Sequence, residues 1–416
     1  MRNWQHRDVR AQWTPMRWPA AWRDPSLLEL LRDSPVNYLL AADGDAARRL
    51  RTDAEAKGLK VTVSADPAEG VDVVKGDWPG TRMAGPGENE RAAAGPTGEP
   101  WIDSNGWRVL LAKALHPGRE IWVDAAPAEP RLYPESYVAG LADASAHGGR
   151  WIIQLDGKLA AGIAAGNAPG TAVWKRLLAA GRFFVDWRWS GLQEQALIGV
   201  ISDFTGKNEF IGQETLNLLA RANQQYRVMP LASAGTESLS GLKTVLYVAQ
   251  DPPTPQLRAL LLGFVQQGGL LVGGPVWGVP AGPVDRDGHP RYDVRQHGKG
   301  RIAIGLKAED DPYLLVQDAI VLTSHRNDLL RFWNGGAVRA CLAEAPDHRR
   351  ALLQLVFYAN ARAGDATVRV AGAYRTARLY TLEGTAAKEL PTLPEKGAVE
   401  LHLPAVAQYA AVQLDA

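Results

Sequence analysis

Short apolar runs alternate with helix-like stretches along the first 330 residues, and this alternation restricts the fold more than any other feature. The run at 36–42, VNYLLAA, is typical of a buried strand, and the Ala-, Arg- and Leu-rich stretch at 45–57 is typical of a helix. Continuous apolar strands separated by helices indicate parallel strands covered by helices. The sequence therefore predicts an α/β protein. Further strands are expected early in the chain at 59–65, 71–77, 119–125, 150–156 and 182–187.

Changes in this pattern divide the 416 residues into three expected domains. Residues 1–190 contain 12 of the 14 tryptophans, and we predict a trimmed (β/α) TIM-like barrel there, because a full barrel usually needs ~250 residues. Residues 191–332 repeat the strand–helix rhythm and predict an open-sheet, flavodoxin-like α/β domain. In residues 333–416 apolar and polar residues alternate between turn signals, which predicts a small antiparallel β-sandwich.

Charge and composition exclude several classes of partner. The 46 basic residues nearly balance the 45 acidic ones, so we expect no nucleic acid partner. No stretch approaches the ~18 apolar residues of a membrane span. The single cysteine, Cys341, the scattered histidines and the lack of phosphate-loop spacing predict no metal and no cofactor. The N-terminus has no signal-peptide profile, so the compartment stays open between a cytoplasmic protein and a mature exported form.

Acidic residues close several of the expected strands in the first domain. In parallel α/β folds the carboxyl ends of the strands converge on one crevice, which makes these residues candidates for a site. The alternative is that each Asp caps the helix that follows it. The strand-end acids are Asp77, Asp103, Asp124, Asp156 and Asp186.

The segment 95–107, GPTGEPWIDSNGW, combines indole rings with polar side chains at one of these strand ends. Trp101 and Trp107 flank Asp103 and Asn105, a composition typical of a sugar site, because indole faces pack against sugar rings. Asp103 has three interpretations: it does chemistry, holds a sugar hydroxyl, or caps the helix expected from Trp107. We favour the second.

Three phrases in the C-terminal half resemble the β-galactosidases of glycoside hydrolase family 42. They are LKTVLYVAQDPPTPQLRALLLGFVQQGGLLVGGP, GKGRIAIG, and the closing HRRALLQLVFYAN to GAVELHLPAVAQYAAVQL. The resemblance implies a TIM-type barrel, a glutamine-amidotransferase-like domain used in oligomerisation, and a C-terminal β-domain. It therefore also implies a homo-oligomer formed through the second domain. The family's Asn-Glu motif is not found on any expected N-terminal strand. The Asn208–Glu209 pair lies after the first strand of the second domain, so the family's catalytic residues are not carried over.

These observations lead to one main functional hypothesis and two alternatives. Glycoside hydrolysis needs two carboxyl groups beside the scissile bond, and we predict a glycoside hydrolase that acts on a neutral oligo- or polysaccharide. The alternatives are a non-catalytic carbohydrate-binding protein on a degenerate barrel, and a lyase or isomerase. The catalytic candidates are Asp103 and Asp156, which form the favoured pair, with Asp124 and Glu209. The candidate substrate-binding residues are Trp101, Asn105, Trp107, Asp186 and Trp187.

Overall fold

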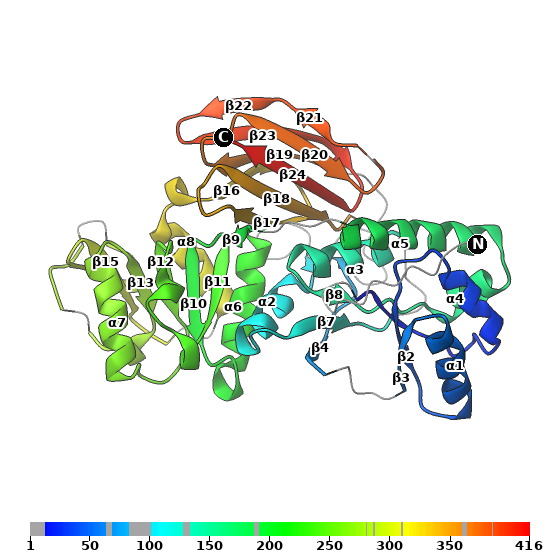
Figure 1. Cartoon of the computed structure of the whole chain (residues 1–416). Helices are drawn as coiled ribbons and strands as arrows, with labels where there is room; N and C mark the ends of the chain where they lie inside the picture. The colour runs from blue at the N-terminus through cyan, green and yellow to red at the C-terminus, as the bar shows by residue number, and fades with distance from the viewer. Residues whose placement is uncertain are drawn as a thin grey trace, which may run out of the picture.

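A computed structural model gives the structure of the chain, which combines helices with parallel and antiparallel sheets (Figure 1). The predicted mixed α/β class is confirmed. The structure describes residues 13–63, 69–82, 101–127, 134–186, 191–279, 281–285, 288–308, 311–359, 364–384 and 386–416.

Six parallel strands near the N-terminus lie side by side in the order β3–β2–β1–β8–β7–β4. The strand β1 joins β8 through a parallel bridge between Met16 and Ile153, where the N–H of Ile153 donates to the Pro15 carbonyl at 2.9 Å. The last strand of the set thus pairs with the first, as in a (β/α) barrel. The strands are β1 Pro15–Arg17, β2 Tyr38–Ala41, β3 Lys60–Val63, β4 Val71–Lys75, β7 Glu120–Asp124 and β8 Arg150–Trp151.

The outer edges of β3 and β4 have no strand partner within the described ranges. The two strands are consecutive in the chain, and seven residues, 64–70, separate the end of β3 from the start of β4. A crossover that contains a helix needs at least about 10–12 residues, so this connection is too short for one. Within the described residues, the sheet is therefore open between β3 and β4.

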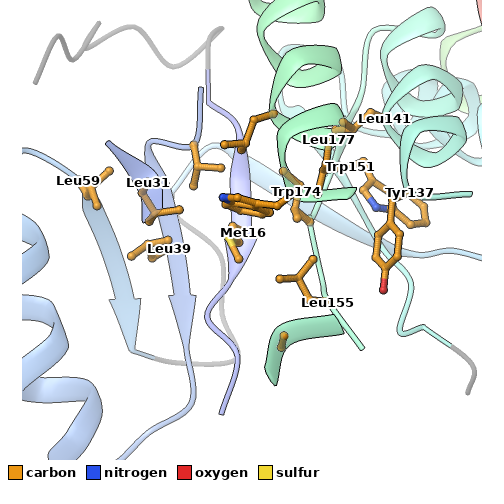
Figure 2. Close-up of a cluster of buried hydrophobic side chains, with 14 of the residues drawn as sticks. Met16, Leu31, Leu39, Leu59, Tyr137, Leu141, Trp151, Leu155, Trp174 and Leu177 are labelled. Carbon is orange, nitrogen blue, oxygen red and sulfur yellow. The ribbon is translucent and has the colours of Figure 1, made fainter. Parts of the chain in front are cut away.

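Helices cover the outer face of this sheet and bury its apolar side chains. Met16, Leu39 and Trp151 pack in one cluster with Leu141 of α3 and Leu177 of α5 (Figure 2). Burying a side chain of this kind contributes about 1.5–3 kcal/mol, so the cluster is a main support of the fold. The helices of this part are α1 Asp45–Ala56, α2 Gly106–Leu115, α3 Pro134–Ala146, α4 Gly157–Ala164 and α5 Ala168–Asp186.

The strand predicted at 182–187 is wrong, because helix α5 continues through this segment to Asp186. Gly181 lies inside the helix where the helix passes Pro35. A Cβ atom at this position would lie 2.8 Å from the Pro35 Cγ atom. The glycine thus permits a close approach between a helix and a loop, and it does not end the helix.

A second sheet has the order β11–β10–β12–β13–β15–β14, in which only β14 is antiparallel to its neighbour. Helices α6 and α8 pack on one face and α7 packs on the other. The sequence did not lead us to expect β14 or α8. The elements are β10 Ile198–Ser202, α6 Glu209–Arg221, β11 Tyr226–Pro230, β12 Thr244–Tyr247, α7 Pro255–Gln266, β13 Leu270–Gly273, β14 Tyr292–His297, β15 Gly300–Gly305 and α8 Pro312–Thr323.

The C-terminal residues form two antiparallel sheets with a shared hydrophobic core (Figure 1). Their orders are β16–β19–β23–β22 and β21–β20–β24–β18–β17–β9. The strand β9 comes from the segment between α5 and β10, and it ties the start of the second sheet to the C-terminal part. The strands are β9 Gln193–Glu194, β16 Leu330–Asn334, β17 Val338–Glu344, β18 Arg350–Phe357, β19 Gly364–Ala371, β20 Thr376–Thr381, β21 Lys388–Leu390, β22 Thr392–Glu395, β23 Ala398–Val406 and β24 Tyr409–Asp415.

Candidate functional site

The N-terminal parallel sheet carries different side chains on its two faces. Leu39 and Val123 pack in the cluster beneath the helices. Tyr38, Trp122 and Ile152 belong to a separate cluster on the opposite side, which we call the inner face. Side chains alternate along a strand, so residues two positions apart share a face. The inner face can therefore be followed to the carboxyl end of each strand.

Four polar residues lie on the inner face at the carboxyl ends of the strands. Asp124 and Gln154 each come two residues after an inner-face residue. The strand register places Lys75 of β4 beside Asp124, and Arg17 of β1 beside Leu40 of the same face. We call Arg17, Lys75, Asp124 and Gln154 the carboxyl-edge cluster.

Arg17 connects the other strands of the carboxyl-edge cluster. Its Nη2 atom donates to Asp124 Oδ2 at 2.6 Å, and its Nε atom donates to Gln154 Oε1 at 3.2 Å. The Arg17 and Asp124 side chains are 40% and 31% exposed. The cluster is thus a charged, hydrogen-bonded group that solvent and ligands can reach.

Below the cluster, three aromatic rings fill the inner face. Trp13, Tyr38 and Trp122 contact one another with ring centroids 4.9–5.7 Å apart. The Trp122 Nε1 atom donates to Glu120 at 3.1 Å, and burial raises the pKa of the Glu120 carboxyl. The three rings of this aromatic layer are buried, whereas the polar layer above it is exposed to solvent.

Asp156, one of the two favoured catalytic candidates, caps helix α4. Its Oδ1 atom accepts from the N–H of Leu159 at 2.8 Å, and its Oδ2 atom accepts from the Tyr137 hydroxyl at 2.7 Å. The Tyr137 ring in turn contacts Trp78, which follows β4, at a centroid distance of 5.0 Å. The structure thus uses this carboxylate in the way that the capping interpretation expects.

Asp103, the other favoured candidate, lies in a short hairpin of β5 (Gly80–Thr81) and β6 (Ile102–Asp103). It binds Arg82 through both carboxylate oxygens, at 2.5 and 3.3 Å, and it is not the residue that precedes helix α2. Two guanidinium groups contact the neighbouring Trp101 ring, that of Arg82 at 5.2 Å and that of Arg221 at 3.8 Å from the ring centroid. Asp103 and Asp156 therefore have different partners.

Asn105 is fully buried and uses its polar atoms inside the protein. Its main-chain N–H and its Nδ2 atom donate to the buried Asp143 carboxylate, and its Oδ1 atom accepts from the N–H of Asp77 at 2.7 Å. Tyr358 donates to the other oxygen of Asp143 at 2.7 Å. The polar residue predicted to hold a ligand holds the fold together in this structure.

Among the described residues, the remaining candidates do not bind Arg17, Asp124 or Gln154, but Trp107 lines a groove that Lys75 also lines. Trp107 is buried in the core beside the second sheet, with the Arg108 guanidinium 4.3 Å from its ring centroid. Glu209 is exposed at the first residue of α6. The expectation that Asp186 closes a strand is wrong, because it ends helix α5. Trp187 lies outside the described residues.

Asp124 is therefore the predicted acid that joins a polar cluster on the inner face. Sequence reasoning missed its neighbours Arg17, Lys75 and Gln154. A usable signal was present for Lys75 and Gln154, which lie in the runs predicted as strands at 71–77 and 150–156, whereas no strand was expected at Arg17. Their shared face follows from strand pairing, which a single sequence does not display.

No group of three or more His, Cys, Asp or Glu side chains in the described ranges has the arrangement of a metal site. In the same ranges, no helix combines the length and the apolar character needed to cross a bilayer.

The chain is similar to known proteins in its structure, but no match is found from its sequence. No family model and no curated protein matches the chain. The structure is similar to α-L-fucosidase isoenzyme 2 from Paenibacillus thiaminolyticus, with a TM-score of 0.54 at 12% identity, over 89% of this chain and 70% of that one.

Two β-galactosidases are more distant in structure. The enzyme from Bacillus circulans sp. alkalophilus has a TM-score of 0.46 at 13% identity, over 88% of this chain. The enzyme from Rahnella sp. R3 has a TM-score of 0.47 at 12% identity, over 91% of this chain. The chain spans 63% of the length of each. The resemblance to glycoside hydrolases expected from the sequence is confirmed for the fold by the similarity to the fucosidase.

Proposed function

We propose that the protein binds a carbohydrate at the carboxyl-edge cluster without hydrolysing it. The observation that supports this most directly is the contact of Arg17 with Asp124 and Gln154, at the ends of three neighbouring strands. Guanidinium, carboxylate and amide groups together offer the donors and acceptors that sugar hydroxyls need. The carboxyl ends of parallel strands are also where α/β proteins bind their ligands.

The half-buried rings of Trp18 and Trp78, which follow β1 and β4, pack against the core beneath the helices, so the sugar contacts proposed at the carboxyl-edge cluster are polar. The nearly balanced charge of the whole chain favours neutral oligosaccharides as the first probes.

Binding is favoured over hydrolysis by the contacts of the carboxylates. Glycoside hydrolysis needs one carboxyl group that carries a proton and a second that faces the substrate. Asp103, Asp124 and Asp156 each direct oxygen atoms at donors within the protein. In this arrangement the carboxylates hold neighbouring side chains and backbone in place.

Hydrolysis of a glycosidic bond is the second candidate function, and the exposure of Asp124 supports it. The side chain is 31% exposed and is bound by one Arg17 nitrogen, so a ligand can compete for it. In this alternative Asp124 is the nucleophile or base. Asp156, which also follows a strand end, is the candidate for the acid.

A glycan array followed by titration of the hits tests both candidates. We expect Asp124→Asn to weaken binding about tenfold or more, and Asp251→Asn to leave it unchanged. Asp251 is a matched control because it forms a similar ion pair, with Lys207 at 2.6 Å, on the second sheet's side of the molecule. If the wild type releases reducing sugar and Asp124→Asn abolishes this release, hydrolysis replaces binding as the proposed function. Equal binding by both variants would remove the carboxyl-edge cluster as the site.

A further inference from the structure

The open edge of β4 borders a groove that the carboxyl-edge cluster does not fill. This β4 groove lies between the edge strand and helix α2 and has a volume of about 480 Å³. Ligand sites for small molecules typically measure about 300–1,000 Å³, so the groove is large enough for a sugar residue or two. Its lining includes Val73, Lys75, Arg108, Leu115, His116 and Gln213.

Lys75 belongs to both the groove and the cluster. It is exposed, it lies on the inner face, and the strand register puts it beside Asp124. Among the described residues no carboxylate pairs with its ammonium group, because Asp124 pairs with Arg17. Lys75 is therefore a positive charge without a negative partner at the border of the proposed sugar site.

A second cationic side chain in the groove, Arg108, has one donor atom without a hydrogen-bond partner among the described residues. The Nε atom of Arg108 is buried and has no hydrogen-bond partner among the described residues. Its Nη2 atom is engaged, since it donates to Asp77 at 2.8 Å. A buried donor without an acceptor is costly, by about 1–3 kcal/mol, unless water or a ligand supplies one.

The acids near the groove are already neutralised. Asp72, which also lines the groove, pairs through one oxygen with Arg119 at 2.6 Å, while its other oxygen is buried and has no hydrogen-bond partner among the described residues. Asp77 pairs with Arg108. The charge left over in the groove is therefore positive, although the whole chain carries a net charge of only +1.

We propose that the β4 groove binds an anionic sugar residue, whose carboxylate or sulfate group is held by Lys75 and Arg108. Oxyanion oxygens accept hydrogen bonds from both kinds of donor, and charge-assisted bonds are stronger than neutral ones. The apolar Val73 and Leu115 side chains, 39% and 38% exposed, provide surface for the CH groups of the ring. This inference rests on the proposed carbohydrate function and adds that a ligand which reaches the β4 groove carries a charged sugar residue there.

The alternative is that Lys75 only protects an edge strand. Charged side chains, lysine above all, are common on exposed edges, where they discourage pairing with other chains. That role needs no ligand, and it predicts no difference between charged and uncharged sugars.

Titration calorimetry at low salt with matched probes separates these interpretations. The probes are a trisaccharide of galacturonic acid, its uncharged methyl ester, and a sulfated galactose trisaccharide, each added to the full chain. We expect at least one anionic probe to bind about tenfold more tightly than the ester. The two anionic probes distinguish a carboxylate ligand from a sulfate ligand.

Two variants complete the test. We expect Lys75→Met to remove the preference for the anionic probe, and Lys175→Met, at an exposed position on α5, to retain it. Equal binding of acid, sulfate and ester would overturn the anionic site and leave carbohydrate binding intact. An anionic preference that survives Lys75→Met would overturn the assignment to this groove. If neither these probes nor any neutral oligosaccharide binds, the proposed function itself fails.

Discussion

The backbone and the side chain of Asn105 both donate to one oxygen of the buried Asp143 carboxylate, at 2.6 and 3.1 Å. The other oxygen accepts from Tyr358. Asn105 precedes α2, Asp143 lies in α3 and Tyr358 follows β18. One carboxylate therefore joins the N-terminal sheet, the helix that packs against the second sheet, and the C-terminal sheets.

We expect Asn105→Ala to lower the free energy of unfolding by about 1–3 kcal/mol, because it removes the side-chain bonds to the N–H and carbonyl groups of Asp77 and one of the two bonds to the buried Asp143. Urea unfolding followed by circular dichroism measures this loss. Asn217→Ala is the control, since the Asn217 amide binds Glu214 within one helix. A loss for the control as large as that for Asn105→Ala would contradict the special role of Asn105.

Two glycine substitutions in helices should have opposite effects. Gly181→Ala places a Cβ atom 2.8 Å from Pro35, so we expect a loss of about 1–3 kcal/mol from overpacking. Gly263→Ala in α7 meets no atom within 4 Å, so we expect a gain of about 0.5–1 kcal/mol from helix propensity. Thermal unfolding of the two variants checks both signs. A gain for Gly181→Ala would mean that α5 does not approach Pro35 as closely as described.

Glu120 should make stability depend on pH. Burial raises the pKa of its carboxyl above the ordinary value of 4.5, so the folded chain binds this proton more readily than the unfolded chain. The contribution of Glu120 to stability therefore falls as pH rises from the ordinary value through the raised one. Glu120→Gln removes this ionisation, so its stability relative to the wild type should rise over the same interval. Unfolding at several pH values tests this, with the exposed Glu209→Gln as control.

Arg17→Met should separate binding from stability. The side chains of Arg17 and Asp124 are 40% and 31% exposed. Exposed ion pairs of this kind contribute at most about 1 kcal/mol to the free energy of unfolding. We therefore expect little change in thermal unfolding but a clear loss of sugar binding. A large drop in melting temperature with unchanged binding would instead give Arg17 a structural role.

The strands most visible in the sequence were those buried on both faces. The runs at 36–42 and 119–125 contain β2 and β7, because continuous apolar stretches of this length suit a parallel sheet between two packed layers. The segment at 182–187 has the same apolar character but continues a helix. Helix α5 passes Pro35 at Gly181, a contact with a distant part of the chain that the local sequence does not display.

The candidate site was less accessible to prediction than the fold. Asp124 could be named from its place at a strand end. Its pairing with Arg17, 107 residues earlier, depends on the order of strands in the sheet. Asn105 and Trp107 lie in a segment whose composition is typical of a ligand site. Both residues are nevertheless buried by contacts with distant parts of the chain.

The bridge between Met16 and Ile153 has a consequence for synthesis on the ribosome. The two residues are neighbours in the middle of the sheet, yet β1 has no partner on that side until residue 153 has emerged. At about 5–20 residues per second, the nascent chain holds this strand half-paired for several seconds. The centre of this sheet is thus completed only by β8, the last of its six described strands to be made.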